Sequence, residues 1–194
     1  LDSLASATHA RALVAHAMNS AGKERAAAER AAVSACNKIA DREQRAAPIL
    51  DAMAGTEETI ALLPLLAEVG GREALAKTAA AAGSNNADIS AAAVRALADW
   101  PNEAALPHLR EPAGDTKNLP RHVLALRGII RLAIASNKPP AEKAGILKDV
   151  ISTARRTEEK RLALGNLAEA RCVESLMTAA AYLDDPALKN EAAL

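Results

Sequence analysis

Aromatic residues are nearly absent from this chain: its 194 residues include one Trp, one Tyr and no Phe. Surfaces that bind nucleobases or sugar rings commonly stack them on several aromatic side chains. The scarcity of aromatic side chains argues against a surface in this segment that binds nucleic acid or carbohydrate. It also excludes a core built on a few large rings, so we expect helices that approach closely through small side chains.

Cysteines and long apolar runs are scarce as well. Cys36 and Cys172 fall in the first and last parts of the chain, where we expect two buried, inert thiols and no bridge between them. Charge-free apolar stretches such as 59–67 are far shorter than the roughly 20 residues of a membrane-spanning helix. We therefore expect no membrane span.

An excess of one charge sign is also missing, because 24 basic residues balance 24 acidic ones. Nucleic-acid binding relies on a positive stripe, and membrane-surface binding on a basic amphipathic helix. The balanced charge of the chain as a whole therefore predicts binding neither to nucleic acid nor to a membrane surface. One region is locally basic, and it is either an anion-binding patch or a solvated face interleaved with Glu158, Glu159 and Glu169. Its basic residues are Arg121, Arg127, Arg131, Arg155, Arg156, Lys160 and Arg161.

Alanine and leucine dominate what is present, with 50 and 24 copies. Alanine is the best helix former, so the composition predicts an all-α protein. A Leu-Ala-acid triplet recurs at Leu66, Leu97 and Leu167, and Ile129 stands at the diverged copy between the last two. These anchor residues are 31, 32 and 38 residues apart, a spacing typical of stacked two-helix repeats.

Glycine and proline clusters divide the chain into helix pairs. Within the pairs, we expect Thr56 to begin a helix, residues 111–115 to form a linker, and Pro186 to start the last helix. The sixth pair lacks a C-cap and its Leu194 matches the position three before an anchor, which predicts a truncated repeat in a longer protein. The expected pairs span residues 1–40, 41–69, 70–100, 101–136, 137–169 and 170–194.

Aligning the second helix of each pair on its anchor gives a common register. Three residues before the anchor the side chain is always apolar: Leu63, Val94, Leu126 and Leu164. The positions two before and two after are i,i+4 neighbours, so they form one stripe on the outer side of each helix. This largely polar stripe consists of Pro64, Glu68, Arg95, Asp99, Arg127, Arg131, Gly165 and Glu169.

Several segments resemble HEAT repeats, namely 88–97, 104–109 and 120–127. The stretch 156–167 followed by 182–188 is similar to a subgroup found in large exported bacterial proteins, often beside carbohydrate-active or haem-binding domains. The resemblance implies a right-handed α-solenoid and an interaction module, and it transfers no catalytic residue. It also implies an exported or periplasmic location, while the residues themselves leave a cytoplasmic location open.

Residues typical of catalysis or metal binding do not form a recognisable motif. No phosphate-binding glycine loop, zinc-protease helix or nucleophile elbow occurs. His9 and His16 are about 10.5 Å apart along a helix, too far to share one metal ion, and His108 and His122 lack companion ligands. We interpret all four histidines, and Trp100, as surface or packing residues, and predict no catalytic, cofactor or metal site.

The predicted function is a non-catalytic scaffold that binds a protein or another domain of its own chain. The second helices would line a concave face of one solenoid spanning residues 1–194. The residues expected to contact the partner are Arg95, Asp99, Arg127, Arg131 and Glu169. Two alternatives remain open: a domain that positions substrate for an attached enzyme, and an anion- or nucleic-acid-binding module.

Overall fold

A computed structural model describes residues 2–54 and 59–193 of the chain, and within these residues it contains helices and turns but no strand. The predicted all-α class is confirmed. The chain divides into two compact units, Leu1–Pro101 and Asn102–Leu194, and each is described separately.

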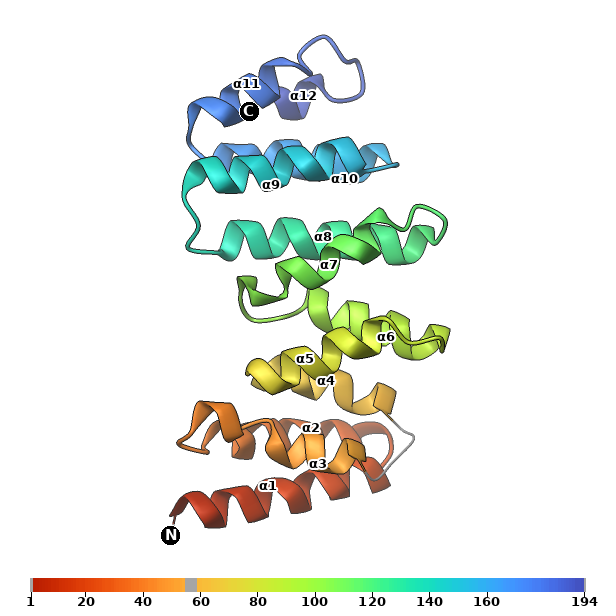
Figure 1. The fold of residues 1–194 in the computed structure, drawn as a ribbon, viewed down its shortest axis with the longest axis vertical. Helices are drawn as coiled ribbons and strands as arrows, with labels where there is room; N and C mark the ends of the chain where they lie inside the picture. Colours follow the sequence, from red (N-terminus) through yellow and green to blue (C-terminus); the bar gives the residue numbers. More distant parts are fainter. Residues whose placement is uncertain (1, 55–58, 194) are drawn as a thin grey trace. The chain divides into compact units, whose positions relative to one another are not determined.

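The first unit contains six α-helices and one short 3-10 helix among its described residues (Figure 1). Its elements are α1 (Asp2–Asn19), α2 (Gly22–Asn37), η1 (Arg42–Gln44), α3 (Ala47–Ala54), α4 (Thr59–Val69), α5 (Arg72–Ala82) and α6 (Ala87–Ala98). Helix α1 packs on α2 and α3, α4 packs on α2 and α3, and α6 packs on α4 and α5. The helices of this unit therefore pack on a sequence neighbour and, with the exception of α5, on the next helix but one.

The second unit repeats this scheme (Figure 1). Its elements are η2 (Glu103–Ala105), α7 (Leu106–Gly114), α8 (Leu119–Ala135), α9 (Pro140–Thr153), α10 (Thr157–Asn166), η3 (Leu167–Glu169), α11 (Val173–Ala180) and α12 (Lys189–Ala192). Helix α8 packs on α7, α9 and α10, while α11 packs on α9 and α12 on α10. Helices α7 and α8, and α9 and α10, thus form packed pairs, and the second helices α8, α10 and α12 contact one another in turn.

Local sequence explains where several helices begin. The Asn86 side chain accepts hydrogen bonds from the backbone N–H groups of Asp88 and Ile89, and Asn118 caps α8 through Arg121 N. Between α4 and α5, Gly70 and Gly71 have φ values of 72° and 98°. Only glycine adopts such values without a steric cost, so this pair fixes the turn between the two helices.

The helix ends differ from the sequence prediction in the second unit. Residues 111–114 belong to α7, because Pro112 and Ala113 are buried and their packing outweighs proline's preference for a first turn. The last helix starts at Lys189 rather than Pro186, since Asp185 accepts a hydrogen bond from Ala187 N and closes a turn there. The expected helix start at Thr56 and the match of Leu194 lie outside the described residues.

The predicted apolar register of the second helices is buried. Anchors Leu66, Leu97, Ile129 and Leu167 are at most 8% exposed, as are the residues three positions before them. Trp100, at the end of the first unit, is 1% exposed, as expected of a packing residue. By contrast, α11 carries Val173, Leu176 and Met177 on one face with more than half of each residue's surface accessible.

Candidate functional site

The polar stripe predicted for the second helices is accessible to solvent in both units. Pro64, Glu68, Arg95 and Asp99 are exposed on or next to α4 and α6, which pack on each other. In the second unit Arg127, Arg131 and Glu169 are exposed, and Gly165 is half-buried. The five predicted contact residues thus reach the surface, two in the first unit and three in the second.

Arg127 also has a partner inside the fold. Its Nε and Nη2 donate to the Glu159 Oε1 atom at 3.0 and 2.8 Å, and the Glu159 side chain is 1% exposed. The other carboxylate oxygen lies 3.3 Å from Arg156 Nε. Helices α8 and α10 are therefore joined by a buried carboxylate held between two arginines, and Arg127 is a structural residue as well as a stripe residue.

Several basic residues in the region 121–161 form ion pairs with carboxylates of the same unit. Arg121 forms ion pairs with Glu111 and Asp115, and its side chain is 12% exposed. Its hydrogen bonds and attraction to Glu111 raise the pKa of the guanidinium further above its ordinary value. Arg161 pairs with Glu191, and Arg156 with Glu158 and Glu159. At least four of the seven cations thus have carboxylate partners, so much of the positive charge of this region is balanced within the unit.

His122 is completely buried and connects three segments of the second unit. Its Nδ1 lies 2.6 Å from the Ala113 carbonyl, an acceptor, so Nδ1 carries the proton. Its Nε2 then accepts from the Arg155 backbone N–H at 3.4 Å. The two bonds tie α8 to the end of α7 and to the loop between α9 and α10, which fits the structural role predicted for this residue.

The remaining histidines and the two cysteines differ in how far they reach the surface. In the described parts of the chain, no group of three His, Cys, Asp or Glu side chains could hold a metal ion, and no helix is long and apolar enough to cross a membrane. His9, His16 and His108 are exposed. Both cysteines are free; Cys36 is buried, which raises the pKa of its thiol to about 11, whereas Cys172 is only half-buried, contrary to expectation.

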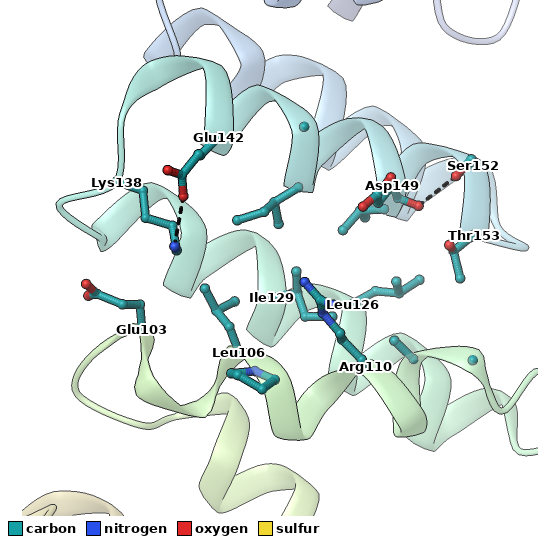
Figure 2. A pocket seen from close by; sticks show the side chains of 16 residues that line it. Glu103, Leu106, Arg110, Leu126, Ile129, Lys138, Glu142, Asp149, Ser152 and Thr153 are labelled. Atoms are coloured by element: carbon teal, nitrogen blue, oxygen red, sulfur yellow. Dashed lines mark hydrogen bonds and ion pairs between the residues drawn. The ribbon is translucent and has the colours of Figure 1, made fainter.

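A groove that the sequence did not predict lies in the second unit, on the side of α8 away from the stripe. It has a volume of about 700 Å³ and runs between α7 and α9 with α8 as its floor (Figure 2). Leu126 and Ile129 form part of that floor. At 100° per residue they lie on a side of α8 roughly opposite Arg127 and Arg131, so the groove and the stripe are separate surfaces.

Charged side chains border this apolar floor. Figure 2 shows Glu103, Lys138 and Glu142 at one end, and Asp149 with two hydroxyl residues at the other. Lys138 pairs with Glu142 at 3.0 Å. Between the two ends, the Arg110 side chain rises from α7 toward α9 (Figure 2). No hydrogen bond or ion pair of the Arg110 guanidinium is found within the described residues.

The burial of Glu159 and the groove were not predicted from the sequence, for different reasons. Glu159 looked like one of several solvated acids, yet it precedes the buried Ala163 and Leu167 by four and eight residues. That helical spacing places all three on one face and could have indicated its burial. The groove has no comparable signal, because most of its lining residues come from three different helices and share no motif.

Comparison with known proteins gave no match of this chain to a protein-family model, a curated protein or a solved structure.

Proposed function

We propose that this chain is a non-catalytic protein-binding scaffold built as a right-handed α-solenoid of HEAT-like helix pairs. In such an array each pair contacts only its neighbours, so the second helices align into one extended surface. A partner protein, or another domain of the same chain, would bind across the stripe residues Arg95, Asp99, Arg127, Arg131 and Glu169.

The observation that carries this proposal is the repeated register of the second helices. In four of them the anchor and the residue three before it are buried, while the positions two before and two after reach the surface. The packing of α4 on α6, and of α8 on α10, also supports it, because it brings successive stripes together within each unit. Their mixture of acidic and basic residues suits a protein partner better than a phosphate backbone.

Charge swaps at matched positions test the proposal. Arg95→Glu with Asp99→Lys reverses an exposed i,i+4 pair on the stripe and keeps the net charge. Glu73→Lys with Lys77→Glu does the same on α5, a first helix whose two side chains are also exposed. Arg127 is unsuitable for this purpose, because its reversal would place a second carboxylate against Glu159.

The measurement is capture of partner proteins by the immobilised chain, with chemical cross-links mapped by mass spectrometry. We expect the stripe swap to reduce capture at least tenfold and to remove cross-links to second helices, and the α5 swap to change neither. Equal capture by both variants would contradict binding through the second helices.

A further inference from the structure

We propose that an exposed apolar face of α11 binds a second copy of this chain, in a hollow between α1 and α2 of that copy. This face, the ridge, consists of Val173, Leu176, Met177 and Ala180. The α1–α2 hollow is lined by His9, Ala12, Leu13 and His16 of α1 and by Ala31, Ser34, Ala35 and Lys38 of α2. Neither surface contains any of the five stripe residues, so the inference goes beyond the proposed scaffold function.

Helix α11 turns its large apolar side chains toward solvent. Val173, Leu176 and Met177 are 65%, 73% and 69% exposed, whereas the buried residues of this helix are Ser175 and Thr178. A surface helix of a globular protein normally buries its apolar side and exposes its polar side, so the polarity of α11 is inverted. A continuous exposed apolar face of this kind is typical of a protein-binding surface.

The α1–α2 hollow has the shape that a helical ridge needs. It has a volume of about 660 Å³, and Ala12, Ala31, Ser34 and Ala35 give it a lining of small side chains. Such a lining lets a third helix approach toward the short end of the usual separation of roughly 8–10 Å. The lining residues of α1 and those of α2 each follow the spacing i, i+3, i+4 and i+7, as the ridge does. The ridge can therefore lie lengthwise in the hollow.

Opposite charges lie beside the two surfaces. On the hollow, Lys38 has no ion pair among the described residues, His9 is exposed, and His16 lies 3.5 Å from Glu24. No carboxylate is found among the described residues that line the hollow. Beside the ridge, Glu174 is exposed, is the one charged residue of α11, and has no ion pair in the described part of the chain. A contact between Glu174 and Lys38 would satisfy both charges.

Glu174 carries its charge at neutral pH. Hydrogen bonds from its backbone N–H and from the Cys172 thiol lower the pKa of its carboxyl group. The nearest exposed charges before and after α11, Arg171 and Asp184, cancel each other. A pair of Glu174 with Lys38 would place the beginning of α11 at the end of α2, so the two helices would run antiparallel. Because one chain carries both complementary surfaces, we assign the hollow to a second copy.

The small size of the ridge predicts a weak contact. Helix α11 has eight residues and extends for about 12 Å, so the interface falls below the roughly 800 Å² per partner of a stable complex. We expect the chain to self-associate with a Kd on the order of 10–100 µM. Sedimentation equilibrium measures this as a mean mass that rises above the 20.1 kDa of the monomer as concentration increases.

Two variants each block one surface without changing the net charge. Leu176→Gln with Met177→Gln makes the ridge polar. Ala12→Gln with Ser34→Gln fills the hollow with longer side chains, and both positions are exposed. Circular dichroism checks that each variant is folded, and if the second is not, Ser34→Gln alone serves in its place.

A control variant changes the same two helices outside the hollow. Ala15→Gln with Asn37→Gln alters exposed residues of α1 and α2 that do not line it. We expect the control to associate like the unaltered chain, and each blocking variant alone to stay monomeric up to about 500 µM. An equimolar mixture of the two blocking variants should form a dimer and nothing larger, because one supplies an intact hollow and the other an intact ridge.

A charge swap tests the orientation of the contact. Glu174→Lys and Lys38→Glu should each weaken self-association by about two- to fivefold, as expected of an exposed ion pair, and the double variant should restore it.

Contrary results would overturn the proposal while leaving the stripe untouched. They are an unaltered chain that stays monomeric at about 1 mM, a blocking variant that associates as strongly as the control, or a mixture that stays monomeric. Association lost in the ridge variant but kept in the hollow variant would mean that two ridges meet, which equally rejects the hollow as the binding site.

Discussion

The second helices of both units bury the same positions, but the two units differ in the kinds of side chain that fill their interiors. In the first unit the large buried side chains are apolar, Thr78 is the only fully buried polar residue among those described, and each ion pair joins side chains at least 30% exposed. The second unit buries His122 and Glu159 and surrounds them with hydrogen bonds and arginines. Packed helix pairs of this chain thus have either an apolar interior or one with a polar network, in which the buried Glu159 carboxylate is paired with two arginines.

The strongest test of this contrast removes the largest side chain of the first unit. Trp100→Ala should lower the free energy of unfolding by about 3–5 kcal/mol, because a fully buried ring leaves a cavity in a core of small residues. Urea unfolding followed by circular dichroism at 222 nm measures the change. Leu176→Ala on α11 removes an exposed leucine and serves as control, with an expected change below about 0.5 kcal/mol. Similar losses in both variants would contradict a contribution of the buried Trp100 ring to the apolar core of the first unit.

The next test breaks the polar network at its centre. His122→Ala should cost about 2–4 kcal/mol, since it leaves a cavity and two backbone groups, the Ala113 carbonyl and the Arg155 N–H, without partners. In the first unit, Thr78→Val removes only a bond to the Ala74 carbonyl of its own helix and should cost less than about 1 kcal/mol. His122→Asn retains a donor near the Nδ1 position and should fall between the two. An effect of Thr78→Val as large as that of His122→Ala would remove the distinction between the units.

A smaller difference in the free energy of unfolding is expected between alanine variants of two arginines that lie one turn apart on α8. Arg127→Ala should cost about 2 kcal/mol, because the buried Glu159 carboxylate keeps only Arg156 as a cationic neighbour. That figure is below the range for a fully buried pair because Arg127 is itself 54% exposed. Arg131→Ala should cost less than about 0.5 kcal/mol, since the residue is exposed on the stripe. Equal costs in urea unfolding would show that the contact between Arg127 and Glu159 does not stabilise the second unit.

The helices and their buried faces could be predicted from the sequence, because both depend on the spacing of residues within one helix. The period of 3.6 residues fixed which positions around Leu97 and Ile129 are buried, and glycine and proline clusters marked most pair boundaries. The last turn of α7 was missed because the burial of Pro112 depends on tertiary packing rather than on helix propensity.

The binding surfaces were predictable only in part. The stripe follows from the same periodicity as the core, so its exposure could be expected from the sequence. The ion pair of Arg127 with Glu159, and the groove beneath Arg110, depend on how helices distant in sequence meet. No spacing within a single helix encodes such contacts, which is why the interpretation of Arg127 as a partner-binding residue alone was incomplete.

The central claim, that the helix pairs stack in a row, is tested most directly by small-angle X-ray scattering of the whole chain. Six pairs stacked at the usual 8–10 Å helix spacing form a particle roughly 55 Å long, with a radius of gyration of about 19 Å or more. A chain of this length folded around one shared core would have a radius of about 16 Å. A monomer at the larger value, with an asymmetric distance distribution, is the predicted result; a monomer near 16 Å with a symmetric distribution would contradict the scaffold account.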